Sequence, residues 1–158
     1  MSKARSSRGS FAVAALAAAA LVLGTSTARA DVSEAAKNEM VARQWYALWA
    51  QRRDWAPFDA MLSDDFAFSS TNGEDHISKA EFKRQCWAPN VNLTKGFDLE
   101  LVMAKGNEVF VKYLGHTVNG KTFRNVELLR MRHGKIASIE CYFGGKMTFP
   151  SGVESQKN

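Results

Sequence analysis

The sequence predicts an α+β domain in which a curved antiparallel β-sheet is wrapped around a long N-terminal helix. Helical periodicity dominates the beginning of the chain after its leader, and β-prone runs separated by tight turns dominate the part after about residue 97. Helices followed by a run of strands are typical of α+β domains. One curved sheet closed against the long helix would bury the apolar face of each.

The first thirty residues have the features of a secretory signal peptide. Basic residues precede an apolar run from Phe11 to Leu23, and the segment ends in Ala28-Arg29-Ala30, a small-x-small cleavage site. The run is shorter than the roughly 20 residues that a membrane-spanning helix needs. We therefore expect cleavage near Ala30, a periplasmic or secreted protein, and no stable membrane insertion.

The leader also accounts for most of the positive charge. The chain has 21 Lys and Arg residues against 16 Asp and Glu, and four of the basic residues but no acidic one lie in residues 1–30. The near-neutral remainder gives no reason to expect a nucleic-acid partner. Its length suits a single domain, for which we expect the bounds 31–150, followed by a flexible tail at 151–158.

Two helices are expected next. From Val32 to about Arg52 the apolar residues recur at helical spacing, which predicts a long helix with an aromatic face. A shorter helix is expected from Asp54 to Leu62, because Asp54 can cap it and Pro57 falls in its first turn, where a missing N–H costs little.

A short strand and a third helix follow. Phe66 to Ser70 alternates apolar and small residues, which predicts a strand, and a polar loop comes next. Ser78 followed three residues later by Glu81 is a capping box, so a helix is expected from about Lys79 to Trp87.

The rest of the domain is predicted to be β-structure. The turns between the strands are marked by Gly106-Asn107, Asn119-Gly120 and His133-Gly134. The expected strands are Phe97–Ala104, Val109–Val118, Thr122–Met131 and Ile136–Phe143.

The turn residues also predict which side chains share a face of the sheet. A two-residue turn at Asn119-Gly120 places Val118 opposite Lys121. The resulting pairs would be Lys112 with Glu127, Leu114 with Asn125, and His116 with Phe123.

The turn at His133-Gly134 leaves two registers open. A two-residue turn would carry Arg124 and Arg130 into the core beside Cys141, with no opposing acid. A three-residue turn with Gly134 in the left-handed position would instead bring in Glu127, already opposite Lys112. We favour the second register, with Glu140 and Tyr142 outside and an inner wall that holds Phe110, Leu114, His116, Phe123, Asn125, Glu127, Leu129, Met131, Ile139, Cys141 and Phe143.

An apolar wall with a few polar groups at one level is how a small-molecule pocket is usually lined. The predicted partner is therefore a small hydrophobic molecule. Lys112 and Glu127 could equally form a structural ion pair, and His116 could be a solvated histidine. Cys86 and Cys141 could form a disulfide in an oxidising compartment or remain two buried thiols.

Short motifs are spread along the whole domain: Tyr46-Ala-Leu-Trp49, Asp54-Trp55, Met61-Leu-Ser-Asp-Asp65, Cys86-Trp87, Asn125-Val-Glu127, Gly134-Lys-Ile136 and Ile139-Glu-Cys-Tyr-Phe-Gly144. In their order and spacing these motifs resemble the NTF2-like superfamily, and within it the SnoaL-like proteins, which include polyketide cyclases and ketosteroid isomerase-like proteins. The resemblance implies a conical α+β barrel that opens beside the third helix and often forms a homodimer through the outer face of its sheet.

The resemblance implies candidate catalytic residues. Ketosteroid isomerases bind an oxyanion with a tyrosine and a protonated acid, positions that Tyr46 and Glu127 match by spacing. Their aspartate base has no counterpart, since Phe68-Ser-Ser-Thr71 has no carboxylate. His116 is the candidate proton carrier. No cofactor or metal is expected, because no His and Cys cluster has ligand spacing.

Three functions follow from this reading: a binding protein for an apolar ligand, a cofactor-independent isomerase or lyase, or a dimeric interaction module. Burial would raise the pKa of Glu127, whereas Lys112 would keep it ionised. Asn125 would orient a carbonyl group of the ligand. The other predicted ligand-binding residues are Trp49, Trp87, Phe110, Phe123, Leu129, Cys141 and Phe143.

Overall fold

The computed structural model describes the backbone of residues 16–144 and the side chains of residues 34–144. Helix α1 runs from Leu16 to Gln51 and so begins well before the predicted Val32. The first half of the expected leader and the tail at 151–158 lie outside the described residues. Among the described helices, none is both long and apolar enough to cross a membrane.

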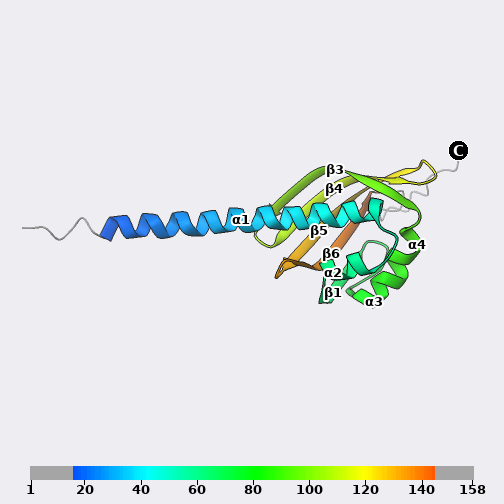
Figure 1. The fold of residues 1–158 in the computed structure, drawn as a ribbon, viewed down its shortest axis with the longest axis horizontal. Helices are drawn as coiled ribbons and strands as arrows, with labels where there is room; N and C mark the ends of the chain where they lie inside the picture. Colours follow the sequence, from blue (N-terminus) through cyan, green and yellow to red (C-terminus); the bar gives the residue numbers. More distant parts are fainter. Residues whose placement is uncertain (1–15, 145–158) are drawn as a thin grey trace, which may run out of the picture.

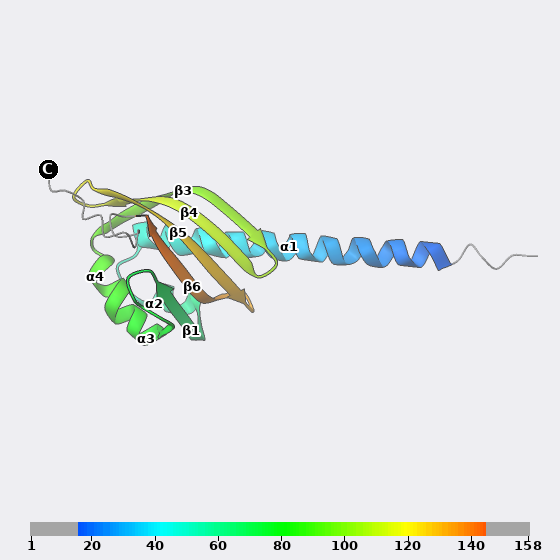
Figure 2. The same cartoon turned by 180° about the vertical axis from the view of Figure 1, so that it is seen from behind.

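A curved six-stranded sheet forms the body of the domain and wraps around α1 (Figures 1 and 2). Its strand order is β2-β1-β6-β5-β4-β3. The predicted α+β fold is confirmed, although β1 lies parallel to β6 and the sheet stays open at β2 and β3. The strands are β1 (Leu62–Ser70), β2 (Ile77–Ser78), β3 (Thr94–Lys105), β4 (Glu108–Thr117), β5 (Thr122–Arg132) and β6 (Lys135–Gly144).

Short helices cover one end of the sheet. Helix α2 spans Ala56–Met61 and carries a proline in its first turn. Helix α3 spans Lys79–Phe82, and the predicted capping box is present in full between Ser78 and Glu81. A π-helical turn, Lys83–Trp87, continues α3, and α4 (Ala88–Asn90) completes the segment. Such π-turns are frequent at functional sites.

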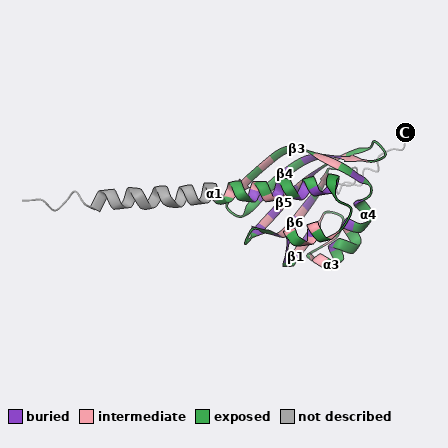
Figure 3. Cartoon of the chain, viewed as in Figure 1, coloured by how far each residue is buried: buried purple, intermediate pink, exposed green. Residues whose placement is uncertain are grey.

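The core lies between α1 and the concave face of the sheet. Helix α1 contacts β3 and β4, and the Asn38 amide donates a 2.9 Å hydrogen bond to the Gly106 carbonyl between these strands. Trp45 is almost fully buried and packs edge-on against Phe58 of α2. Figure 3 shows buried and exposed residues alternating along the strands, as expected for a sheet with one covered face.

The predicted register of the β4–β5 hairpin is wrong by one residue. Three residues, not two, separate Thr117 from Lys121, whose backbones pair at 2.9 Å, and Gly120 takes the left-handed conformation at φ 81°. The Thr117 hydroxyl stabilises this loop, since it accepts a 2.9 Å bond from the Lys121 amide. A type I turn followed by a left-handed glycine is the usual three-residue hairpin.

This slip moves every side chain of β4 to the opposite face. Tyr113 now lies opposite Asn125, whereas Lys112 lies opposite Val126 on the outer face and forms a 3.0 Å ion pair with Glu100. The predicted pairing of Lys112 with Glu127 is therefore wrong. The predicted inward positions of Phe110, Leu114 and His116 are wrong for the same reason.

The favoured face of the β5–β6 hairpin is confirmed, but the turn differs. His133 and Gly134 form a two-residue turn with positive φ angles of 51° and 74°, as a type I′ turn requires. The pairing then shifts between Arg130 and Met131, which leaves Ala137 as an extra residue in β6. Beyond this bulge Glu127 lies opposite Cys141, as predicted.

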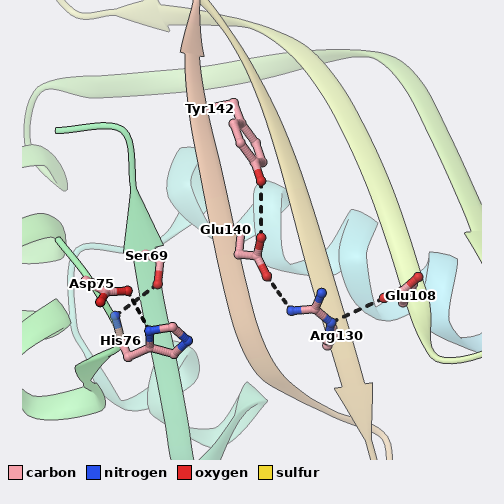
Figure 4. Close-up of polar contacts among 7 residues, drawn as sticks. All are labelled: Ser69, Asp75, His76, Glu108, Arg130, Glu140 and Tyr142. Carbon is pink, nitrogen blue, oxygen red and sulfur yellow. Dashed lines mark hydrogen bonds and ion pairs between the residues drawn. The ribbon is translucent and has the colours of Figure 1, made fainter. Parts of the chain in front are cut away.

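The outer face carries the charged residues that a buried face could not hold. Figure 4 shows Arg130 of β5 paired with Glu108 of β4 and with Glu140 of β6. Tyr142 donates a 3.2 Å hydrogen bond to Glu140 on the same face. Glu140 and Tyr142 thus lie on the outer face as predicted.

Candidate functional site

A cavity of about 570 Å³ lies between the C-terminal part of α1 and the concave face of the sheet, and the π-helical turn forms part of its wall. This volume suits a small organic ligand. Its described lining residues are mostly aromatic and polar: Trp45, Tyr46, Trp49, Phe68, Asn72, Glu74, Phe82, Gln85, Cys86, Asn90, Leu93, Thr94, Phe97, Tyr113, Thr117, Phe123, Asn125, Glu127, Ile139, Cys141, Phe143 and Gly144.

Glu127 lies at the centre of a buried hydrogen-bond network in this cavity. The Tyr46 hydroxyl donates to one carboxylate oxygen at 2.6 Å, and the Tyr113 hydroxyl donates to the other at 2.7 Å. The Asn125 amide donates a 3.0 Å bond to the Tyr113 oxygen. Three elements, α1, β4 and β5, therefore position one carboxylate.

Burial controls the protonation of this network. It raises the pKa of Glu127, while the hydrogen bonds from Tyr113, Tyr46 and Cys141 act in the opposite direction. The pKa values of both tyrosines lie well above the ordinary value, first because of burial and then because of the nearby Glu127 charge. The tyrosines thus remain hydrogen-bond donors throughout the neutral range, and Glu127 is the group that titrates.

A second carboxylate lines the cavity from the loop after β1. The Ser70 hydroxyl donates a hydrogen bond to Glu74, which is half-buried. Burial, and then the charge of Glu74, raise the pKa of the Cys86 thiol to about 11. The cavity therefore has one acid within its buried network and a more exposed one in the loop after β1.

The structure places the predicted site residues in three environments. Phe110 and His116 lie on the outer face, where His116 contacts Asp98 at 2.7 Å, so neither reaches the cavity. Trp87 and Leu129 are buried in the core without lining the cavity. The predicted residues that line the cavity together are Tyr46, Trp49, Phe123, Asn125, Glu127, Cys141 and Phe143.

Among the cavity residues that were not predicted, three bear most on its chemistry: Tyr113, Phe97 and Glu74. Tyr113 and Phe97 pack on Tyr46, with ring centroids 5.2 and 5.4 Å from it. The predicted two-residue turn between β4 and β5 would place Tyr113 on the outer face. The alternation of Tyr113 with Val109 and Val111 was the sequence signal for its inward position. Glu74 follows Phe68-Ser-Ser-Thr71, the segment in which the aspartate base of ketosteroid isomerases was expected. The conformation of the loop after β1 brings Glu74 to the cavity.

Cys86 and Cys141 both line the cavity and are free thiols in this structure. The Asn125 amide lies 3.7 Å from the Cys141 sulfur. Burial, followed by the Glu127 charge, raises the pKa of the Cys141 thiol far above the ordinary value, which favours the protonated thiol over the thiolate. Within residues 34–144, no group of three His, Cys, Asp or Glu side chains has a metal-binding arrangement.

One long helix inside a curved, open sheet, with a polar cluster on the concave face, defines the NTF2-like class of α+β folds. The sequence profile of the SnoaL-like domain matches residues 42–139, and the chain belongs to this family. No curated protein sequence matches the chain.

Solved structures share the fold at low sequence identity. A candidate ketosteroid isomerase from Kribbella flavida DSM 17836 is 16% identical, with a TM-score of 0.60 over 79% of this chain and 90% of that one. An NTF2-like protein from Anabaena variabilis ATCC 29413 is 24% identical, with a TM-score of 0.56 over 71% and 93%. A ketosteroid isomerase-like protein from Catenulispora acidiphila DSM 44928, solved in complex with trimethylamine, is 15% identical, with a TM-score of 0.53 over 65% and 84%.

Proposed function

We propose that the protein is exported and binds a small hydrophobic molecule in the cavity between α1 and the sheet. The observation that carries this proposal is the lining itself, a wall rich in aromatic side chains with one cluster of convergent polar groups around Glu127. Ligand sites combine an apolar wall with a few placed polar groups in this way. The sequence features of residues 1–30 support export.

Two measurements test this proposal. The protein exported from its native host should carry a co-purifying apolar molecule that mass spectrometry identifies after denaturation. Tyr46→Phe should weaken its rebinding, whereas Tyr142→Phe, which removes an outer-face hydroxyl, should leave it unchanged. The absence of any co-purifying molecule, or equal affinities of the two variants for the molecule that is found, would refute the assignment.

A cofactor-independent isomerase or lyase acting on a hydrophobic carbonyl compound is the second candidate. It is favoured by the 2.6 Å bond between Tyr46 and Glu127, because a buried carboxyl with a raised pKa can exchange protons with a substrate. Glu74 would supply a second carboxylate for this chemistry. Glu127→Gln should then lower kcat by about 10²–10⁴-fold, and an unchanged kcat would exclude this mechanism.

We also propose a homodimer through the outer face of the sheet. Exposed apolar residues of this face are Leu101 and Met103 on β3 and Phe110 on the adjacent β4, and Tyr142 is exposed on β6, beyond β5. The ion-paired residues Arg130, Glu108 and Glu140 lie on the same face, with Glu140 beside Tyr142 (Figure 4). Exposed apolar side chains among polar ones are typical of an interaction surface.

Analytical ultracentrifugation tests the dimer. Phe110→Glu should shift the protein to a monomer, whereas Met40→Glu, at an exposed position on α1, should not. A monomeric wild-type protein at micromolar concentration would refute the dimer, and would also argue against the third candidate function, a dimeric interaction module without activity.

A further inference from the structure

The charges of the cavity are of one sign. Glu127 and Glu74 are the charged residues among the described residues that line it, and no Lys, Arg or His of residues 34–144 does so. From this juxtaposition with the aromatic walls, we infer that the ligand is a hydrophobic cation, an amine or quaternary ammonium whose charge sits beside Glu127. This inference rests on the proposed binding function and narrows the class of its ligand.

The buried carboxylate of Glu127 has hydrogen-bond donors but no counter-ion. The groups that face it are the hydroxyls of Tyr46 and Tyr113 and the thiol of Cys141, all of them neutral. An uncompensated buried charge is costly, and burial accordingly raises its pKa. A bound cation would supply the charge that the protein itself does not provide.

Two basic residues considered as internal counter-ions, Lys112 and Arg53, are engaged elsewhere. Lys112, which the sequence placed opposite Glu127, pairs with Glu100 on the outer face. Arg53, two residues after the end of α1, donates to the carbonyls of Trp49 and Thr94 and is exposed to solvent. Neither side chain lines the cavity.

The walls suit an alkylated ammonium group. Nine aromatic side chains are among the described lining residues. A cation held near such rings is attracted by their negative faces, and this attraction is strongest when the cation is desolvated. Tyr46 and Tyr113 donate to the carboxylate and pack against Phe97, and the centroids of the three rings lie 4.8–5.4 Å apart. An anionic ligand would meet repulsion from Glu127 and Glu74 instead.

Three probes of similar size test the sign of the charge. The cation is benzyltrimethylammonium, its neutral carbon isostere is neopentylbenzene, and the anion is 4-phenylbutanoate. Quenching of Trp45 and Trp49, which both line the cavity, reports binding. We expect the cation to bind at least about tenfold more tightly than the isostere, a difference of about 1.4 kcal/mol, and the anion to bind most weakly.

Variants locate the carboxylate responsible. Glu127→Gln should abolish most of the preference for the cation while the neutral isostere still binds, and Glu74→Gln should reduce it less. Glu140→Gln, which removes an outer-face carboxylate, is the matched control and should retain the full preference. Retention of the preference in Glu127→Gln would overturn the assigned position of the charge.

The wild-type protein provides a test that needs no variant. A bound cation favours the ionised form of Glu127. The affinity of the protein for benzyltrimethylammonium should therefore rise as the pH increases through the pKa of Glu127. Calorimetry in two buffers should show that binding releases protons. Affinity independent of pH would overturn the inference. Equal affinity for the cation and the isostere would overturn it while leaving the proposed binding function intact, whereas failure of all three probes to bind would overturn both.

Discussion

Removal of one hydroxyl from the buried network should destabilise the protein in a pH-dependent way. Tyr46→Phe deletes the donor of the 2.6 Å hydrogen bond to Glu127 and leaves the ring in place. A hydrogen bond to a charged group contributes about 1.5–3 kcal/mol, and one between neutral groups about 0.5–1.5 kcal/mol. Tyr46→Phe should therefore lower the free energy of unfolding by about 1.5–3 kcal/mol at pH values where Glu127 is ionised, and by about 0.5–1.5 kcal/mol where Glu127 is protonated.

Urea unfolding of the wild type and Tyr46→Phe across a pH series measures this difference. The pKa of Glu127, followed by NMR of its side-chain carboxyl carbon, should rise further in the variant, because one bond that lowers it is gone. Tyr142→Phe is the matched control: this residue is 50% exposed and donates a 3.2 Å bond to Glu140. Its effect should stay within about 0.5 kcal/mol. A cost for Tyr46→Phe that is equal at all pH values, or as small as the control, would refute the role of Glu127 as the titrating centre.

Three further outcomes follow from the structure. Folding raises the pKa of Glu127, so the free energy of unfolding of the wild type should fall as the pH rises from the unfolded-state to the folded-state pKa, by at most about 1.4 kcal/mol per pH unit. Urea titrations of Glu127→Gln should lack this slope. The same pH dependence of the unfolding free energy in both proteins would contradict the raised pKa. Gly115→Ala should cost about 1–3 kcal/mol, because its Cβ would lie 2.3 Å from the Phe123 ring; thermal unfolding should show that Phe123→Leu in the same chain recovers most of this loss. Lys112→Met should not change the pKa of Glu127 measured by NMR. A rise in this pKa would indicate that Lys112 and Glu127 are paired, as in the two-residue register.

Local signals predicted most of the fold correctly. The capping box of Ser78 and Glu81, the turn glycines and the alternation of the late strands each act through near neighbours in the chain, so the residues themselves reveal them. The parallel pairing of β1 with β6 could not be predicted this way, because it joins segments about 70 residues apart. The bulge at Ala137 also escaped prediction, since it has no sequence signature of its own.

The part of the candidate site on β5 and β6 was predicted correctly, and the part that depends on the register of β4 was missed. Glu127, Asn125 and Cys141 face inward as expected, because their register follows from the cost of burying arginines on the other face. Tyr113 and the outward positions of Phe110 and His116 depend on the number of residues in the β4–β5 turn. Asn119-Gly120 favours the two-residue turn, but the Thr117 hydroxyl supports the three-residue loop that forms.

The length of this turn determines the charge of the cavity. With two residues in the turn, Lys112 would lie opposite Glu127 and neutralise it, and the site would need no external cation. With three, the slip by one residue brings Tyr113 to the carboxylate and sends Lys112 to Glu100 on the outer face. The neutral hydroxyl of Tyr113 then takes the place of the Lys112 ammonium group. The carboxylate of Glu127 is hydrogen-bonded, but no opposite charge among the described residues of the protein neutralises it. The preference for a cationic ligand, if measured, would therefore be a direct consequence of one extra turn residue.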